Sequence, residues 1–414
     1  MFRIFYSLLI YLLLPLLLLR AVWRGRASGA ERPRERLGFV APDTRRPLLV
    51  HCVSVGETIA AQPLLAALLA RGEPLWVTST TLTGAERVRH VFGERVRRSF
   101  LPVDTPDAVA RFLARVNPRA LLLIETEIWP NLVHAARKRG IPVVLVNARL
   151  SEKSARGYAR FAWLTRPALA QFTAVLAQAD ADAGRFRLLG APEVLQTGNL
   201  KFDVAHDAGL ASRAAELRSA WGRRLVWLAA STHERDEEAV LAAHGALLAR
   251  FPDLLLVLVP RHPERFDAVA ARAARAGFGC ARRSAGERVT DTTAVYLGDT
   301  MGELPLLYAT SDVAFVGGSF SGTGGHNMLE PASLGLPVVT GPSLYNFQSV
   351  SDALVAAGAQ RVAGDDRELA ETVGHWLDDG DARRSAGQAG RDFVQRNRGA
   401  LARSLAAIDK VLAR

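Results

Sequence analysis

The sequence predicts an α/β protein built from two doubly wound domains behind an N-terminal apolar helix. Short apolar runs alternate with helical patterns along the chain, which is the rhythm of stacked βαβ units. These runs lack the alternation of a half-exposed sheet, as expected for parallel strands that helices cover on both faces. The length of 414 residues exceeds one ordinary domain, so two domains are expected.

The first predicted element is the apolar helix. Residues 4–19 read "IFYSLLIYLLLPLLLL", slightly short of the ~20 residues that span a bilayer. A cleaved signal peptide is the alternative, but only Arg3 precedes the run and no small-residue cleavage site follows it. Arginines typical of a cytoplasmic flank follow instead, at Arg24, Arg26, Arg32, Arg34 and Arg36. We therefore expect residues 1–25 to form an uncleaved membrane anchor that spans the bilayer or lies in its interface.

The predicted strands form two sets. The first set is "PLLVHCVSV", "PLWVTSTT", "RSFLPVD", "ALLLIETE", "IPVVLVNAR", "TAVLAQAD" and "EVLQTGN". The second set is "RLVWLAAST", "DLLLVLVPR", "FGCARRS", "AVYLGDT", "DVAFVGGS" and "PVVTGPS". We expect Rossmann-like domains over residues 26–205 and 222–414 with a linker over 206–221, the last helix being able to pack back on the first domain. Ligands of open α/β sheets bind at strand C-termini, so both domains should face a common cleft.

The net charge indicates which partners the protein binds, and the cysteines indicate its redox compartment. The formal net charge of +11 favours anionic partners such as nucleic acid, an acidic membrane surface or a phosphorylated substrate. Cys52 and Cys280 lie far apart and follow no metal spacing, which is typical of buried thiols in a reducing compartment. The sequence contains no zinc or haem motif.

The strongest local pattern is "VAFVGGSFSGTGGHNMLEPASLGLPVVTGP", a strand, a glycine-rich loop and a helix expected to start near Asn327. Glycines let a backbone approach a ligand closely, and a helix start favours phosphate. Glu330, one turn into that helix, would accept hydrogen bonds from two ribose hydroxyls, or would only complement the helix dipole.

Two further motifs carry positive charge. In "LVPRHPERF", Arg261 offers a cationic fork to a phosphate or carboxylate, and His262 either stabilises a leaving phosphate or caps a turn. In "TGNLKFD", Lys201 ends the first domain and would face the cleft.

Acids gather after strands of the first domain. Glu125 and Glu127 in "LLLIETEIWPNL" would point the same way from extended backbone, for acid/base chemistry or for holding a loop. Glu57 in "SVGET" lies where a strand turns into a helix expected to start near Thr58, as a base or as a helix cap. Burial would raise its pKa and the helix start would lower it.

An arginine-rich segment, "TSTTLTGAERVRHVFGERVRRS", contains Thr81 and is expected to form a helix. Its arginines would form a solvated face or dock against anionic lipid headgroups; they are Arg87, Arg89, Arg95, Arg97 and Arg98.

With these motifs in order, the chain resembles the 3-deoxy-D-manno-octulosonic acid (Kdo) transferases of Gram-negative lipopolysaccharide assembly, which adopt the glycosyltransferase B fold. The matching stretches run from the anchor to the last strand: "HCVSVGET", "TSTTLTGAERV", "IETEIWPNL", "VNARLSEKSARGY", "TGNLKFD", "AASTHERDEE", "VPRHPERF", "LGDTMGELPLLYATSDVAFVGGSF" and "GGHNMLEPASLGLPVVTGP". The cysteine of "HCVSVGE" is a minor departure from the family pattern.

The resemblance implies inverting transfer of Kdo from CMP-Kdo to the lipid A precursor (lipid IVA), without metal or cofactor, at the cytoplasmic face of the inner membrane. Residues 26–205 would bind the acceptor and 222–414 the CMP-sugar, with an anionic membrane surface and no nucleic acid as partner. Glu57 would be the catalytic base, and Thr81, Arg87, Glu125 and Glu127 would be acceptor-site or structural residues. The donor site would comprise Lys201, Arg261, His262, Pro263, Met301, Gly302, Glu303, Asn327 and Glu330, with the backbone of Met301 to Glu303 reading the cytosine.

The physical argument agrees with this division, because the base belongs on the acceptor side and positive groups on the side of the leaving phosphate. Two alternatives stay open. One is an inverting glycosyltransferase of the same fold that uses another nucleotide sugar. The other is an extracytoplasmic solute-binding protein, which the arginine cluster and the two distant cysteines argue against.

Overall fold

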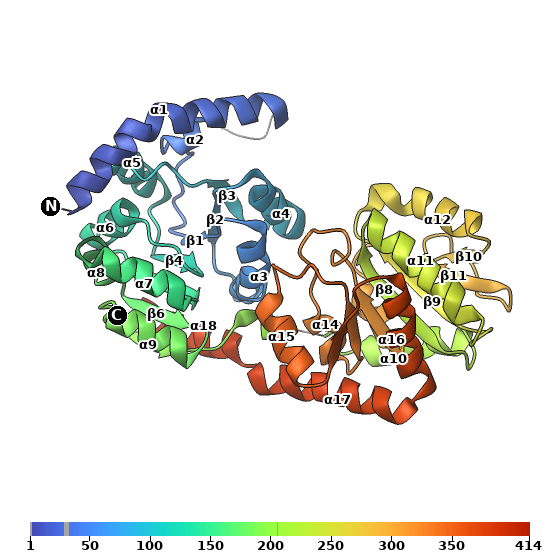
Figure 1. Cartoon of the computed structure of the whole chain (residues 1–414). Helices are drawn as coiled ribbons and strands as arrows, with labels where there is room; N and C mark the ends of the chain where they lie inside the picture. Colours follow the sequence, from blue (N-terminus) through green and yellow to red (C-terminus); the bar gives the residue numbers. More distant parts are fainter. Residues whose placement is uncertain (1, 29–32, 205) are drawn as a thin grey trace. The chain divides into compact units, whose positions relative to one another are not determined.

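The computed structural model describes residues 2–28, 33–204 and 206–414. The chain folds into two compact units (Figure 1), the first made of Met1–Asp203 and Asn397–Arg414, the second of Val204–Arg396. Each unit holds one seven-stranded parallel sheet with helices on its faces. The two doubly wound α/β domains expected from the sequence are therefore present.

The first unit has the strand order β3-β2-β1-β4-β5-β6-β7. Its strands are β1 Leu48–His51, β2 Leu75–Ser79, β3 Arg97–Phe100, β4 Ala120–Ile124, β5 Val143–Ala148, β6 Ala174–Ala177 and β7 Val194–Gln196. Its helices are α1 Phe2–Ser28, α2 Pro33–Arg36, α3 Val55–Ala70, α4 Leu82–Phe92, α5 Pro106–Val116, α6 Pro130–Lys138, α7 Glu152–Arg160, α8 Ala162–Leu169, α9 Asp180–Leu188 and α18 Ala400–Leu412, with 3-10 turns η1 Gly93–Arg95 and η2 Leu200–Phe202.

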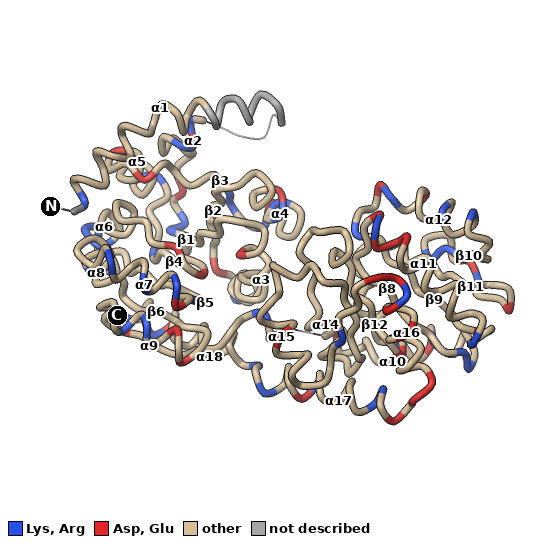
Figure 2. Tube along the Cα trace, viewed as in Figure 1, with Lys and Arg blue, Asp and Glu red and all other residues tan. Residues whose placement is uncertain are grey.

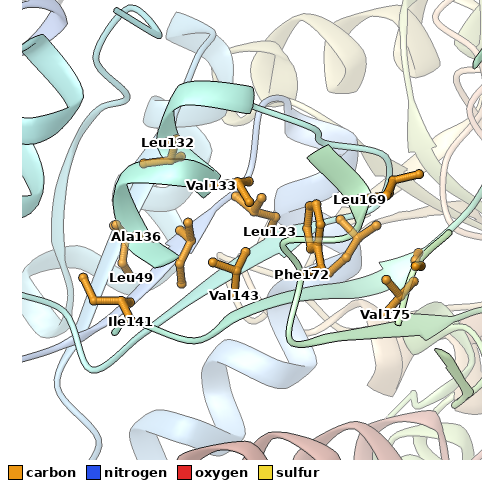
Figure 3. Close-up of a cluster of buried hydrophobic side chains, with 14 of the residues drawn as sticks. Leu49, Leu123, Leu132, Val133, Ala136, Ile141, Val143, Leu169, Phe172 and Val175 are labelled. Carbon is orange, nitrogen blue, oxygen red and sulfur yellow. The ribbon is translucent and has the colours of Figure 1, made fainter. Parts of the chain in front are cut away.

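Strand alternation divides the core of this unit between the two faces of the sheet. In β1, Leu49 joins the cluster under α5, α6, α8 and α9, whereas Leu48 and Val50 join the cluster under α3, α4 and α18. Figure 3 shows the first cluster, where α6 residues Val133 and Ala136 pack above the strands. Both faces are covered, which explains why the strands read as continuous apolar runs.

The second unit has the strand order β10-β11-β9-β8-β12-β13-β14. Its strands are β8 Val226–Thr232, β9 Leu255–Pro260, β10 Gly279–Arg282, β11 Thr293–Leu297, β12 Val313–Val316, β13 Val338–Thr340 and β14 Gln360–Val362. Its helices are α10 Leu210–Ala220, α11 Glu234–Leu248, α12 Phe266–Arg275, α13 Leu304–Ala309, α14 Leu329–Ser333, α15 Gln348–Ala356, α16 Asp366–Asp378 and α17 Gly380–Asn397, with the 3-10 turn η3 Pro263–Arg265. Sequence patterns missed β14, a three-residue strand without an apolar run.

The boundary between the two units does not fall in a separate linker over residues 206–221. Residues 206–221 contain α10, which packs against α13 and belongs to the second unit. After the second unit, the chain returns to the first unit at Asn397. There the Asp203 carboxylate accepts hydrogen bonds from the backbone N–H groups of Gly399 and Leu401 and fixes the start of α18. Leu405 and Ile408 of α18 complete the cluster beside α3.

The N-terminal apolar run forms α1, which packs on α2, α6 and α8 of the first unit. Among the residues that the structure describes, none of the helices combines the length and the apolar character needed to cross a membrane.

Candidate active site

Glu57 lies in the first turn of α3. The helix begins at Val55, earlier than the expected start near Thr58, because Ser54 is the N-cap and its Oγ accepts from the Glu57 N–H at 3.5 Å. The Glu57 Oε2 accepts from the backbone N–H of Val53 at 2.6 Å. The side chain therefore closes the turn and, in doing so, is held in one position at the C-terminal end of β1.

Burial decides the protonation of this carboxyl. The pKa of Glu57 is raised to about 8, mainly by burial and also by the nearby Glu127 and Glu125 carboxylates, while the hydrogen bond from the Val53 N–H opposes the shift. Burial therefore raises the pKa of Glu57 by more than the helix start lowers it. A carboxyl with a pKa near neutrality is suited to take and return a proton.

Glu125 and Glu127 approach Glu57 from the end of β4, as predicted, although not from extended backbone. Glu125 has a φ of 64°, a left-handed conformation that costs energy in a residue with a side chain. Burial also raises the pKa of Glu127. Lys201 Nζ lies 4.0 Å from Glu125 Oε1. We call Glu57, Glu125, Glu127 and Lys201 the acidic cluster.

Two asparagines position Lys201. Asn199 Oδ1 accepts the Lys201 N–H, and the buried Asn147 Oδ1 accepts the Leu200 N–H, each at 3.0 Å. Asn147 is also left-handed, with a φ of 56°. The role of Asn147 was not evident from the sequence, because its contact joins residues more than fifty positions apart.

Thr81 and Arg87 make structural contacts beside this cluster. The Thr81 hydroxyl caps α4 by accepting from Gly84 N–H at 3.1 Å and donates to Val53 O at 3.1 Å. Arg87 donates to Gln62 Oε1 of α3 at 3.3 Å. Thr81 thereby links α4 to the loop that holds Glu57.

The arginine-rich segment is helical only in part, which corrects the prediction. Helix α4 ends at Phe92, and Gly93, with a φ of 55°, turns the chain into η1. Arg95 lies in η1, and Arg97 and Arg98 lie in the edge strand β3. Arginines of α2, the adjoining loop, α4 and β3 line one groove of about 1350 Å³: Arg34, Arg45, Arg89, Arg97 and Arg98. We call it the arginine groove.

In the second unit, Arg261 and His262 follow β9, and His262 is joined by two histidines that the sequence motifs did not single out. The ring of His233, after β8, lies 5.3 Å from the His262 ring. His233 Nε2 is 2.9 Å from His326 Nε2, so one ring donates a hydrogen bond to the other. We call Arg261, His233, His262 and His326 the basic cluster.

Two histidines of this cluster, His233 and His326, are held largely neutral. The pKa of His326 is lowered to about 3, mainly by burial and also by the positive charge of Arg261. Burial also lowers the pKa of His233. An anion bound at this point would reverse the effect by favouring the protonated rings. Each histidine follows one of three adjacent strands, β9, β8 and β12, and this shared position is the signal that could have found them.

The glycine-rich loop is fixed by Asp236. Its carboxylate accepts the backbone N–H groups of Gly318, Phe320 and His233 at 2.8–2.9 Å. A side chain at Gly318, which has a φ of 73°, would collide with the His326 ring. The loop backbone therefore determines where His326 lies.

Helix α14 begins at Leu329, two residues later than expected, so Glu330 is its second residue. The Asn327 side chain explains the shift. Its Oδ1 accepts the Leu329 N–H at 3.1 Å, and its Nδ2 donates to Glu330 Oε1 at 3.0 Å. The structure therefore brings these two predicted donor-site residues into direct contact.

The segment Met301, Gly302 and Glu303 follows β11. The Glu303 carboxylate is engaged by Arg283 through two hydrogen bonds of 2.8 and 3.0 Å and also by Thr300. Arg283 lowers the pKa of Glu303. Gly302 and Glu303 border a pocket of about 810 Å³ against α10 and α13. With the Glu303 side chain committed to Arg283, recognition by this segment would use its backbone.

In the described part of the chain, no group of three or more His, Cys, Asp and Glu side chains is arranged to hold a metal ion.

Comparisons with known proteins identify the family. Residues 31–204 match the family model described as 3-deoxy-D-manno-octulosonic-acid transferase (kdotransferase). The chain is 41% identical to the 3-deoxy-D-manno-octulosonic acid transferase of Haemophilus influenzae, over 98% of this chain and 97% of that protein. The chain belongs to the Kdo transferase family. A Bordetella pertussis member is also 41% identical, over 98% of both chains, and a probable mitochondrial member from Arabidopsis thaliana is 34% identical, over 85% of this chain and 82% of the relative.

Solved structures support the fold of this Kdo transferase. Acinetobacter baumannii MurG matches with a TM-score of 0.55 at 12% identity, over 88% of this chain and all of that one. A Neisseria meningitidis UDP-GlcNAc 2-epimerase matches with a TM-score of 0.55 at 14% identity, over 89% of this chain and all of the other. These likenesses show a glycosyltransferase B fold, and the resemblance inferred from the motifs is confirmed.

Proposed function

We propose that this Kdo transferase moves Kdo from CMP-Kdo to a lipid A precursor, lipid IVA, in lipopolysaccharide biosynthesis, with inversion of the anomeric centre. Kdo transfer follows from membership of the family. The observation that carries the chemistry is the pKa of Glu57, raised to about 8 in a cluster of acids. The two charged clusters, one in each unit, are proposed to serve the two ends of one displacement.

Glu57 is the proposed general base. An acceptor hydroxyl attacks the anomeric carbon of Kdo, the bond from that carbon to the CMP phosphate oxygen breaks, and Glu57 takes the hydroxyl proton. The reaction conserves charge, since the proton remains on Glu57 and the negative charge leaves on CMP. The hydrogen bond from Val53 N–H leaves Glu57 fixed in place, so little reorganisation is needed.

The basic cluster is the proposed site of the donor's negative charge. Arg261 provides a permanent positive charge, and the rings of His233 and His326 become easier to protonate once an anion lies beside them. Lys201 is proposed to meet a second negative group of the donor, the backbone of Met301 to Glu303 the cytosine, and Asn327 with Glu330 the ribose and phosphate.

The lipid acceptor places the reaction at a membrane. We propose that the protein acts at the cytoplasmic face of the inner membrane, attached through α1, and that the arginine groove binds the phosphates of the acceptor.

The test is a transfer assay with purified protein, CMP-Kdo and the tetra-acylated lipid A precursor, comparing wild type, Glu57→Gln and Glu57→Ala. Glutamine can still accept the Val53 N–H, so Glu57→Gln removes the base and keeps the cap. We expect Glu57→Gln to bind CMP normally and to lose about 10²- to 10⁴-fold in turnover. Normal turnover in this variant would show that Glu57 is only a helix cap, and lack of wild-type transfer would refute the donor and acceptor assignment.

A further inference from the structure

Helix α1 turns an apolar face outward. Between residues 3 and 19, every exposed side chain is apolar except Tyr11. Its large members reach 77% exposure at Leu12, and together they form what we call the outer face of α1: Ile4, Phe5, Leu8, Leu9, Leu12, Leu13, Leu16, Leu17 and Leu19. In Figure 2 the described part of α1 is tan beyond its N-terminal end, which marks a stretch without Lys, Arg, Asp or Glu. An ordinary surface helix is arranged in the opposite way, with its apolar stripe facing the protein and its polar side facing solvent.

The inward side of α1 is bound to the first unit through polar groups. Arg3, Ser7 and Tyr11 recur every four residues and so share one side of the helix. Arg3 Nη1 and Ser7 Oγ lie 3.2 and 3.1 Å from Oδ1 of the buried Asn131, and the Tyr11 hydroxyl donates to Asp107 Oδ1 at 2.7 Å.

A second layer of hydrogen bonds fixes these partners. The buried Asp104 carboxylate accepts the Asn131 N–H at 3.0 Å and the Leu132 N–H at 2.8 Å, at the start of α6. Burial raises the pKa of Asp104 to about 6 despite these bonds. Lifting α1 away would break the hydrogen bonds that Arg3 and Ser7 make to Asn131 and that Tyr11 makes to Asp107. The helix is therefore attached along its side and not only at one end.

The outer face continues onto the elbow between α7 and α8. Phe161 and Trp163 are 56% and 54% exposed there, and the Trp163 ring meets Phe5 of α1 edge-on, with centroids 6.3 Å apart. Exposed Arg160 and Arg166 flank the two aromatic residues. Aromatic rings beside basic side chains are typical of the headgroup region of a bilayer.

We propose that the outer face of α1 and the α7–α8 elbow form one lipid-facing surface, with α1 lying parallel to the membrane plane. The inference deepens the membrane attachment proposed above and rests on it. A spanning orientation would either break the side-on bonds of α1 or carry Asp104 and Asn131 into the acyl region with it. A second copy of the chain fits this surface less well. Protein interfaces carry about one hydrogen bond per 100–200 Å², and the nine side chains of the outer face offer no polar group.

The orientation of α1 can be measured with spin labels at single cysteines that replace Leu8, Leu12 or Leu16, in a Cys52→Ala/Cys280→Ser background. Label depth is read from the balance of oxygen and nickel accessibility on vesicles of phosphatidylethanolamine and phosphatidylglycerol. A helix parallel to the membrane gives three similar depths, about 5–10 Å below the headgroups. A spanning helix gives depths that differ by about 12 Å between Leu8 and Leu16, at 1.5 Å per residue.

Equal depths support the proposal. A depth gradient overturns it in favour of spanning, and labels that are shielded in a dimer without lipid overturn it in favour of a second copy.

The double variant Phe161→Ser/Trp163→Ser should bind vesicles about tenfold more weakly, since two apolar side chains leave the lipid. Leu188→Ser is the matched control, because Leu188 is 78% exposed in α9, far from α1 in the first unit, and should change nothing.

Kdo transfer to a detergent-dispersed acceptor is measured on the same variants. It should remain at the wild-type rate, because neither the labelled leucines nor the elbow belongs to the acidic or basic cluster. Lost transfer with equal label depths would count against the proposed function, whereas normal transfer with a depth gradient would count only against the orientation of α1.

Discussion

The acidic cluster of the first unit and the basic cluster of the second unit respond to burial in opposite directions. Burial raises the pKa of Glu57 to about 8 and lowers the pKa of His326 to about 3. Both shifts favour the neutral form of the group at physiological pH. Arg261 supplies the permanent positive charge of the basic cluster. The comparison indicates that burial holds the Glu57 carboxyl and the His326 ring largely in their neutral forms, so that Glu57 acts as a base in its ionised fraction and His326 gains a charge beside an anion.

The clusters differ in how they are built. Glu57 and Glu125 are held by local backbone, through a helix cap and a left-handed residue after a strand. The basic cluster is assembled from three adjacent strands and is fixed by one buried carboxylate, Asp236, that accepts three backbone N–H groups. The geometry of the acidic cluster is therefore sensitive to substitutions close to it in sequence. The geometry of the basic cluster depends on Asp236.

Beyond the Glu57 variants, the largest expected effect comes from removing the permanent charge of the basic cluster. Arg261→Gln should lower kcat/KM for the donor by at least about 100-fold, since a charge-assisted contact to the donor is lost. The same change should raise the pKa of His326, because Arg261 lowers it. Steady-state kinetics and histidine NMR titration measure the two effects. An unchanged donor affinity would remove Arg261 from the donor site.

The next effect concerns stability. The pKa of Glu57 is about 8 in the folded protein and near 4.5 in an unfolded chain, so the folded state binds this proton more tightly. Its contribution to stability is therefore complete below pH 4.5 and is lost as the pH rises through 8. Glu57→Gln should be more stable than wild type at pH 9, by at most ~5 kcal/mol at about 1.4 kcal/mol per pKa unit, with less difference near pH 5. Urea unfolding at both pH values tests this, and a difference independent of pH would contradict the buried, protonated carboxyl.

A smaller change should shift the pH profile. The Glu127 carboxylate raises the pKa of Glu57, so Glu127→Gln should move the rising limb of kcat/KM toward lower pH, by about one unit or less. Asp107→Asn, on α5, is a control that leaves the limb in place. A limb that does not move would mean that Glu57 is not the titrating base.

The smallest expected effect lies in the arginine groove. Replacing Arg89 and Arg98 by glutamine should weaken binding to acidic vesicles only a few-fold, because exposed ionic contacts are individually weak and are screened by salt. Sedimentation with anionic vesicles at low and high salt measures the change. Replacing Arg367 and Arg384, exposed on α16 and α17, provides the matched control for loss of charge. Equal losses in both pairs would indicate a general charge effect and not a groove.

Sequence patterns located most of the fold because its strands are buried on both faces and therefore read as apolar runs. They missed β14, which has only three residues, and extended the arginine-rich helix through Gly93 into β3. Both errors concern edges of a sheet, where pairing to one neighbour outweighs the local pattern.

The candidate site was predictable where a residue's position along a strand sufficed. Glu57, Glu125, Glu127, Arg261 and His262 all follow strands, and the structure places them in two clusters as described above. The contact between His233 and His326 was not predictable, because it depends on the path of the loop that Asp236 holds. The pKa of Glu57 required knowledge of its burial, which no local pattern contains.

The return of α18 to the first unit has a consequence for synthesis. Leu405 and Ile408 fill the core beside α3, so the first unit cannot complete its hydrophobic core until the end of the chain has left the ribosome. The second unit, whose residues are contiguous, can close earlier. During translation, the first unit would therefore emerge first and complete its packing last. Its helix α1 would be synthesised, and its apolar side chains exposed, before that packing is complete.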